Sequence, residues 1–171
     1  MNKKLVVYFS HKGENYSKGR IVNLKKGNTE IAAEIISNIT GADIFEIVAD
    51  KKYPIKYDDC IEIANKELRA NSRPKLKDDI DIKEYDTIFV GYPNWWGTMP
   101  MPVWTFLEEK DFTNKKVLPF CTNEGSGLGK SESDIKKLIG GAEVLKGLAI
   151  NGSEVNNSEK QIKKWLEDSL K

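Results

Sequence analysis

The sequence has almost no net charge, because 27 Lys and Arg residues balance 26 Asp and Glu residues and leave a formal charge of +1. Nucleic-acid binding by counterion release normally needs a large basic excess, so the composition excludes a nucleic-acid partner of that kind. Charged residues make up 31% and hydrophobic residues 39% of the chain, which is typical of a folded globular protein and not of a disordered one. The length predicts one domain over residues 1–171.

Cysteine and histidine are also scarce. Cys60 and Cys121 lie far apart and outside any C-x-x-C arrangement, so we expect reduced, structural thiols. With His11 as its single histidine, the chain cannot build a multi-histidine metal site, and no metal is expected. The apolar run from Leu5 to Phe9 is shorter than a signal-peptide core of about 7–15 residues or a membrane span of about 20. We therefore expect a cytoplasmic protein without a membrane partner.

Apolar runs alternate with amphipathic stretches along the chain. The runs predict strands at 4–9, 43–48, 87–92 and 117–121, and a short one within 143–150. The stretches predict helices over 28–41, from 58 to before 73, from 100 through 107, over 131–139 and from 158. The pattern of residues 10–27 is too irregular for a regular element. This order predicts an α/β fold, with a doubly wound five-stranded parallel sheet and helices on both faces.

Two of the helices carry recognisable end signals. Asn28 or Thr29 can cap the first helix, and Gly41 stands where glycine commonly ends one. Ser158 with Gln161 has the spacing of a capping box for the last helix.

Three loops follow predicted strands at the sheet edge where open doubly wound sheets bind ligands. The first loop, 10–29, is rich in hydroxyls, amides and glycines and enters a helix N-terminus, which suits a phosphate group; an ordinary capped helix after a surface loop is the alternative. It matches neither the Walker A pattern nor G-x-G-x-x-G, so nucleotide triphosphate hydrolysis loses its main support.

The other two loops suit a planar ligand. Trp95 and Trp96 are adjacent in the loop 93–100 and cannot both enter one core face, so an indole there can meet a ligand. Trp104 and Trp165 have helical spacing with apolar residues and are expected in the core. Loop 122–130 has glycines at alternate positions, where backbone can approach a flat group closely. Together the three loops predict a phosphorylated, planar cofactor.

The motifs of these loops resemble those of the flavodoxin family, most closely its bacterial branch of short flavodoxin-like proteins. They stand in the family's order over nearly the whole chain: Tyr8-Phe9-Ser10 with Gly27-Asn28-Thr29, then Gly91-Tyr92-Pro93-Asn94-Trp95-Trp96-Gly97-Thr98-Met99-Pro100, then Phe120-Cys121-Thr122 with Gly125-Ser126-Gly127. The resemblance implies FMN bound non-covalently on a five-stranded parallel sheet of order 2-1-3-4-5.

Carried over residue by residue, the resemblance also implies a cofactor site. Ser10, Asn28 and Thr29 would hold the ribityl phosphate. Residues 93–98 would line one side of the isoalloxazine, and residues 122–127 another. Trp96 would stack on the flavin, and Gly97 could turn its carbonyl towards flavin N5 during reduction. The complete expected set is Ser10, His11, Lys12, Asn15, Asn28, Thr29, Pro93, Asn94, Trp95, Trp96, Gly97, Thr98, Thr122, Asn123, Gly125, Ser126 and Gly127. No residue stands out as an acid–base catalyst.

The chain departs from the family pattern in two places. Residues from about Glu14 to Lys26 interrupt the phosphate loop, and Asn15 with Tyr16 could fold back over the phosphate. His11 and Lys12 could add charge there, and the alternative for His11 is a solvated loop position. The third loop lacks the tyrosine that flavodoxins stack on the outer flavin face. That face could be open, or covered by Tyr53, by Tyr57 or by a second subunit.

Three functions are compatible with this site: an electron carrier, an FMN-dependent NAD(P)H:quinone-type oxidoreductase, and a ligand-binding or scaffold domain without redox function. The intact loop set argues against the third. Carriers of this family are typically acidic, so the +1 charge and the non-acidic Thr98 argue against a low-potential carrier, although Asp58, Asp59 and Glu62 could supply local acidity. The expected partners are redox proteins or a small-molecule electron acceptor, and the protein is expected as a monomer or homodimer.

Overall fold

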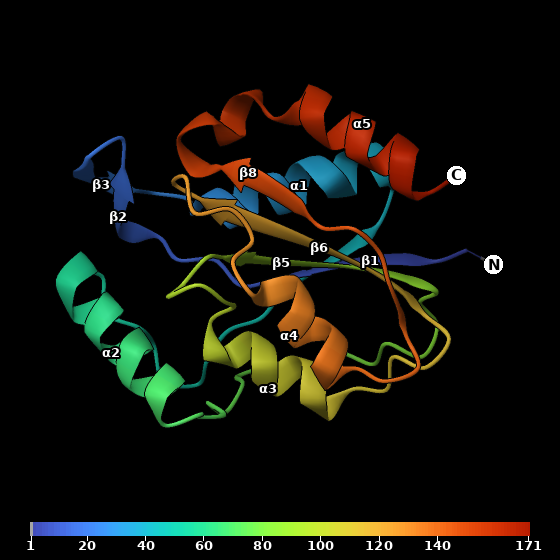
Figure 1. The fold of residues 1–171 in the computed structure, drawn as a ribbon, viewed down its shortest axis with the longest axis horizontal. Helices are drawn as coiled ribbons and strands as arrows, with labels where there is room; N and C mark the ends of the chain where they lie inside the picture. The colour runs from blue at the N-terminus through green and yellow to red at the C-terminus, as the bar shows by residue number, and fades with distance from the viewer. Residues whose placement is uncertain (1) are drawn as a thin grey trace.

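A parallel sheet forms the centre of the fold in the computed structural model, which describes residues 2–171 (Figure 1). Its strands are β1 (Lys4–Tyr8), β4 (Asp43–Glu46), β5 (Thr87–Pro93), β6 (Lys116–Asn123), β7 (Glu143–Val144) and β8 (Leu148–Asn151). They lie in the order β4, β1, β5, β6, and both β7 and β8 pair with β6, all in parallel. The predicted order 2-1-3-4-5 is confirmed, with its fifth position divided between two short strands.

Helices cover both faces of this sheet, as predicted. They are α1 (Asn28–Thr40), α2 (Tyr57–Arg69), α3 (Met101–Glu109), α4 (Ser131–Leu138) and α5 (Glu159–Ser169), with a 3-10 helix η1 (Gly152–Asn157) before α5. Helices α1 and α5 lie on one face, and α3 and α4 lie on the other (Figure 1). Each face has its own hydrophobic core. Ile36 and Trp165 belong to the core under α1 and α5, whereas Phe106 belongs to the core under α3 and α4, and Trp104 packs against that second core. Both tryptophans therefore have the core positions expected of them.

The central strands have continuous apolar sequences because both of their faces are covered. In β1, Leu5, Val6 and Val7 are all inaccessible to solvent, although their side chains alternate between the two cores. The edge strand β4 is mostly exposed. Within residues 2–171 no helix has the length and apolar character needed to cross a bilayer.

Residues 10–27 contain an antiparallel hairpin, so the prediction of an irregular segment is wrong. Strand β2 (Gly13–Ser17) pairs only with β3 (Arg20–Leu24), in a small sheet of their own. Lys18 and Gly19 form the turn with φ angles of 49° and 83°, as a primed two-residue hairpin turn requires. Neither strand has a continuous buried face, and the apolar alternation that identifies a strand in sequence is therefore weak.

The N-terminus of α1 differs from the predicted cap. Gly27 is the N-cap, and neither Asn28 nor Thr29 caps the helix. The hydroxyl of Ser10 instead accepts a hydrogen bond from the Glu30 N–H at 3.2 Å. The cap thus comes from the segment just after β1, which is distant in sequence and which local patterns do not reveal. Gly41 ends the helix with φ 73°, as predicted.

The predicted capping box of α5 does not form, although Ser158 is the N-cap residue. The Ser158 hydroxyl donates to the Val155 carbonyl at 2.6 Å, because the preceding 3-10 helix places that acceptor within reach. Gln161 donates instead to the Ala149 carbonyl of β8 at 3.1 Å.

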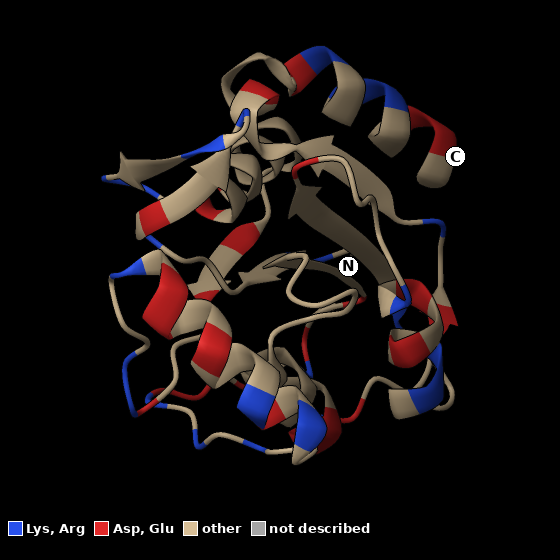
Figure 2. Cartoon of the chain, turned by 60° about the vertical axis from the view of Figure 1, so that its left-hand side comes forward, with Lys and Arg blue, Asp and Glu red and all other residues tan. Residues whose placement is uncertain are grey.

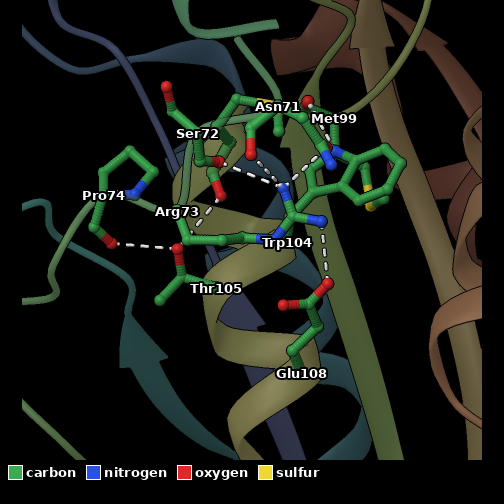
Figure 3. A network of polar contacts seen from close by, with 9 residues as sticks. Asn71, Ser72, Arg73, Pro74, Met99, Trp104, Thr105 and Glu108 are labelled. Atoms are coloured by element: carbon green, nitrogen blue, oxygen red, sulfur yellow. Dashed lines mark hydrogen bonds and ion pairs between the residues drawn. The ribbon is translucent and has the colours of Figure 1, made fainter.

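Arg73 holds the long connection between α2 and β5 (Figure 3). Its guanidinium donates to the carbonyl and side-chain oxygens of Asn71 and to the Ser72 carbonyl, over 2.9–3.1 Å, and to Glu108 on α3 at 2.8 Å. It also lies 5.1 Å from the centre of the Trp104 ring, within the range of a cation–π contact. Arg73 therefore links the α2–β5 connection to α3, the helix that follows the loop carrying Trp95 and Trp96.

Candidate functional site

A cavity of about 370 Å³ lies at the carboxyl ends of the central strands. Its walls come from the hairpin, the N-terminus of α1, one side of α2 and the loops after β5 and β6. The lining residues are His11, Glu14, Asn15, Tyr16, Asn28, Thr29, Tyr57, Cys60, Ile61, Ala64, Pro93, Asn94, Trp95, Trp96, Thr122, Asn123, Glu124, Ser126 and Gly152. The tertiary structure thus brings all three predicted loops to one cavity.

Most of the residues predicted from the sequence line this cavity: His11, Asn15, Asn28, Thr29, Pro93, Asn94, Trp95, Trp96, Thr122, Asn123 and Ser126. The others lie outside its lining: Ser10, Lys12, Gly97, Thr98, Gly125 and Gly127. Ser10 caps α1, Lys12 is exposed, and the buried Thr98 hydroxyl donates to Asp134 at 2.6 Å. Gly97 in the loop after β5, and Gly125 and Gly127 in the loop after β6, each have a positive φ angle that shapes their loop.

One end of the cavity has the character of an anion site. The N–H groups of Asn28 and Thr29 belong to the first turn of α1, where no intrahelical acceptor exists, and they have no other acceptor within residues 2–171. The helix dipole adds positive potential there. A Cβ atom on Gly27 would lie 2.0 Å from Ser10 Oγ, so only glycine permits this close entry into the helix.

The inserted hairpin forms a wall of the cavity. The carboxylate of Glu14 accepts a hydrogen bond at 2.7 Å from the Tyr57 N–H, the first residue of α2, and so caps that helix from a distant segment. At the hairpin turn, Lys18 forms an ion pair with Glu154 of η1 at 3.3 Å. The hairpin therefore spans from α2 to η1, and its Tyr16 ring lies 6.4 Å from that of Tyr57.

His11 and Asn15 organise the entry to this hairpin. His11 Nε2 donates to the Pro54 carbonyl at 2.9 Å, and the Asn15 side-chain amide donates to the carbonyls of His11 and Gly13 at 3.0 and 3.2 Å. Both side chains still line the cavity.

The other end of the cavity is aromatic, and its two tryptophans diverge as predicted. Trp95 packs edge-on against Phe9 and Tyr53, each at 5.1 Å between ring centres. Trp96 remains 53% exposed, and its indole N–H donates to the Ile61 carbonyl of α2 at 3.0 Å. This bond fixes the orientation of an indole whose ring stays accessible beside the cavity.

Trp96 and Gly97 occupy a tight two-residue turn, with φ angles of 57° and 85°. Trp95 and Thr98 close the turn through a pair of backbone hydrogen bonds of 3.0 and 3.3 Å. The Gly97 carbonyl accepts a further bond from the Lys130 N–H at 2.7 Å. The peptide between Gly97 and Thr98 is thus bonded on both sides, and turning that carbonyl would break both bonds.

Asn94 joins the loops after β5 and β6, and Asn123 orders the second of them. The Asn94 side chain donates to the Gly127 carbonyl and accepts from the Gly97 N–H, both at 2.9 Å. The Asn123 side chain accepts from the N–H groups of Gly125 and Gly127 at 2.9 and 3.1 Å. Both asparagines therefore have a structural part in shaping the cavity.

Tyr57 lines the cavity, whereas Tyr53 lies behind Trp95, donates its hydroxyl to Glu67 and is no part of the lining. Burial raises the pKa of Glu67 above its ordinary value. Of the two candidates within the chain for covering a bound ring, only Tyr57 has a suitable position.

Several lining residues were not predicted from the sequence. Cys60, Ile61 and Ala64 form the cavity side of α2 together with Tyr57, which the sequence indicated only as a candidate cover for a bound ring. The helical spacing of Ile61 and Ala64 indicated an ordinary buried face. The thiols of Cys60 and Cys121 are free and buried, and burial raises the pKa of each to about 12. Glu14, Glu124 and Gly152 also line the cavity, and no local pattern distinguishes them from loop or hairpin residues. Tyr16, which the sequence indicated as a residue that could fold back over the phosphate, lines the cavity as well.

The cavity suits an elongated ligand that is anionic at one end and planar at the other. Unpaired N–H groups lie at its α1 end, and an accessible indole lies at its Trp96 end. In addition, Glu124 Oε1 is buried without a hydrogen-bond partner among residues 2–171.

Comparison with known proteins agrees with this geometry. A family model described as flavodoxin matches residues 3–169. No protein with a curated description matches the sequence. Among solved structures, a protein from Bacteroides eggerthii described as a flavoprotein is 28% identical, with a TM-score of 0.79 over 98% of this chain and 97% of its own.

Two further solved structures are similar over most of their lengths. A protein from Bacteroides uniformis, also described as a flavoprotein, is 30% identical, with a TM-score of 0.76 over 95% of this chain and 98% of its own. A flavoprotein from Lactobacillus acidophilus, solved in complex with FMN, is 25% identical, with a TM-score of 0.67 over 92% and 98%. Given the family match over nearly the full length and the sheet order described above, the chain belongs to the flavodoxin family.

Proposed function

We propose that the protein binds FMN in this cavity and acts in electron transfer. The observation that carries the proposal is that one cavity joins the unpaired N–H groups of the α1 N-terminus to the accessible indole of Trp96. FMN has a phosphate at one end and a planar ring at the other. The similarity to a flavoprotein solved in complex with FMN supports the same cofactor here.

The cavity residues divide the binding between its two ends. The N–H groups of Asn28 and Thr29 bind the phosphate, while Trp96, held by its bond to α2, packs on the ring. The backbone of the loop after β6, shaped by Asn123, contacts the ring edge. FMN supplies the redox chemistry, and the surrounding side chains and backbone tune it.

Titration of purified apoprotein with FMN tests this proposal. We expect saturable quenching of flavin fluorescence, with tighter binding of FMN than of riboflavin, because riboflavin lacks the phosphate that the α1 N-terminus binds. Inorganic phosphate should compete with FMN and leave riboflavin binding unchanged. Equal affinity for the two flavins would contradict the assignment of the phosphate site, and no binding of either would overturn the proposal.

A second candidate is an FMN-dependent oxidoreductase that passes electron pairs from NAD(P)H to a quinone-type acceptor. The Gly97 peptide favours it, because its carbonyl is bonded to Lys130 N and its N–H side to Trp95 O. A carrier that moves single electrons would gain from a carbonyl able to turn towards flavin N5, and here that movement breaks both bonds. Photoreduction separates the candidates: a carrier accumulates flavin reduced by one electron, whereas an oxidoreductase passes directly to full reduction and consumes NAD(P)H with a quinone.

The charges beside the cavity suit either candidate. Figure 2 views the molecule from the side on which the strands end; acidic residues gather in the first turns of α2 and basic residues in its last turn. Asp58 and Asp59 supply the acidic end, and Lys66 and Arg69 the basic end. Although the net charge is near zero, opposite charges are thus separated along α2, and this separation can orient a redox protein or a small charged acceptor.

A further inference from the structure

Trp95, Tyr53 and Glu67 form a connected series that leads from the cavity to α2. Trp95 lines the cavity, and its ring lies edge-on to that of Tyr53, with 5.1 Å between the ring centres and 79° between the ring planes. The Tyr53 hydroxyl donates to Glu67 Oε1 at 2.5 Å. Tyr53 and Glu67 lie outside the cavity lining, so the series connects the cavity to groups behind its wall.

Packing alone does not require the Tyr53 hydroxyl. Phe9 lies edge-on to both Trp95 and Tyr53, at 5.1 and 5.6 Å between ring centres, and shows that a ring without a polar group fits this cluster. Glu67 is half-buried, and burial raises the pKa of its carboxyl above the ordinary value, so a carboxylate here is costly. A backbone carbonyl would satisfy the hydroxyl at lower cost, whereas the carboxylate can also take up the phenolic proton.

A tyrosine beside a carboxylate is suited to lose an electron and a proton together. The radical cation of a phenol is a very strong acid, so tyrosine is oxidised readily only when a base accepts its proton. Glu67 is such a base, and the edge contact with Trp95 gives the electron a short route to an indole at the cavity.

Two other tyrosine–carboxylate pairs lack this route. Tyr8 donates to Glu46 at 3.0 Å, in one core. Tyr85 donates to Asp43 at 2.7 Å, beside the other core. Among residues 2–171, Tyr53 alone of these three tyrosines has its ring against a tryptophan ring, and that tryptophan lines the cavity.

We propose that Tyr53 and Trp95 form a one-electron relay into the cavity, with Glu67 as the acceptor of the Tyr53 proton. The relay rests on the proposed function for its oxidant, because a photoexcited flavin in the cavity is a strong one-electron oxidant. Trp95 gives one electron to that oxidant. Tyr53 then gives one electron to the Trp95 radical, while its phenolic proton moves to Glu67.

The relay balances without a further reactant. The oxidant gains one electron, Tyr53 loses one electron and one proton, and Glu67 gains that proton. Both transfers reverse when the electron returns from the cavity to Tyr53. Until then the oxidised residue lies behind the cavity wall, and Trp95 is protected from irreversible oxidation.

Azide radicals test the relay in full-length apoprotein without a flavin. Generated by pulse radiolysis, they remove one electron from accessible indoles. We expect tryptophanyl absorption to decay as tyrosyl absorption appears, at a rate independent of protein concentration. Tyr53→Phe keeps the ring contact and should lose this transfer, as should Trp95→Phe. Glu67→Gln keeps a hydrogen-bond acceptor but cannot take the proton, so the transfer should be slower by about 100-fold.

Tyr85→Phe is the matched control, because it removes a phenol that also bonds a carboxylate but lies against no tryptophan ring among residues 2–171. The transfer should be unchanged in this variant. Glu67→Gln provides an independent test should Tyr53→Phe fail to fold.

Illumination of the FMN-loaded protein in air gives a second readout. Peptide mass spectrometry measures the oxidation products of Trp95 relative to those of Trp104 in the same sample. We expect more Trp95 oxidation in Tyr53→Phe than in wild type, and no change in Tyr85→Phe. Because Tyr53 does not line the cavity, all three proteins should bind FMN with equal affinity.

The outcomes separate the relay from the proposed function. Azide-induced transfer that is unchanged in Tyr53→Phe and in Glu67→Gln overturns the relay. Equal Trp95 oxidation in illuminated wild type and Tyr53→Phe, both loaded with FMN, overturns it as well. Wild-type protein that shows the azide-induced transfer but binds no FMN overturns the proposed function, while the transfer from Tyr53 to Trp95 is supported.

Discussion

The hydroxyl oxygens of Thr29 and Thr122 lie 2.7 Å apart, in a buried hydrogen bond that joins the first turn of α1 to the end of β6. Both side chains are almost inaccessible to solvent, at 1% and 4% exposure. The bond connects the anion end of the cavity to the loop after β6, so the relative position of two binding segments depends on it.

Thr122→Val should therefore destabilise the protein by about 1–3 kcal/mol, because the hydroxyl of Thr29 is left buried and unpaired. Thr29→Val with Thr122→Val removes both polar groups and should cost less than the sum of the single changes. Urea unfolding of the four proteins in a double-mutant cycle measures this coupling. Strictly additive effects would show that the bond contributes no stability.

Trp96 should matter for cofactor binding in two separable ways. Trp96→Ala removes the ring and should weaken FMN binding by about 2- to 10-fold beyond the loss of buried area. Trp96→Phe keeps an aromatic ring but loses the bond to the Ile61 carbonyl, and we expect a smaller loss. Fluorescence titration gives both affinities, and an unchanged affinity and flavin spectrum in Trp96→Ala would remove this residue from the site.

The two buried thiols predict a decrease of stability at alkaline pH. Burial raises the pKa of Cys60 and Cys121 from 9.0 to about 12, so between these values the unfolded chain loses thiol protons that the folded chain retains. Their contribution is complete below pH 9 and is lost as the pH rises towards 12. Unfolding free energies measured from pH 8 to 10 should fall less steeply in a Cys60→Ala, Cys121→Ala variant than in wild type; equal slopes would contradict the assignment.

Arg73 should be sensitive even to a conservative change. Lysine cannot reproduce the planar fork that bonds Asn71, Ser72 and Glu108 and lies on Trp104, so Arg73→Lys should lower the free energy of unfolding by about 1–3 kcal/mol. Lys75→Ala, at a nearby exposed position, is the control. Denaturant midpoints compare the variants, and equal midpoints would show that the connection needs no guanidinium.

Most of the sheet and its helices could be predicted from the sequence, because each element carries its own signal. Leu5, Val6 and Val7 form an apolar run of the kind that belongs in a strand covered on both faces, and Gly41 ends a helix with the left-handed φ that glycine favours. The predicted caps were less accurate. Ser10 and Glu14 cap helices that begin far along the chain, and no local pattern can show such a partner.

The sequence by itself determined the order of the central strands and main helices along the chain, the family and the three loops that meet at the cavity, because apolar periodicity and short motifs are local properties. Only the tertiary structure decided that residues 10–27 form a hairpin wall, that the Gly97 carbonyl is bonded to Lys130, and that Glu124 and Asn28 pack closely against Gly152. Those features depend on contacts between segments distant in sequence. Likewise, the near-zero net charge does not show that α2, which lines the cavity, is acidic in its first turn and basic in its last.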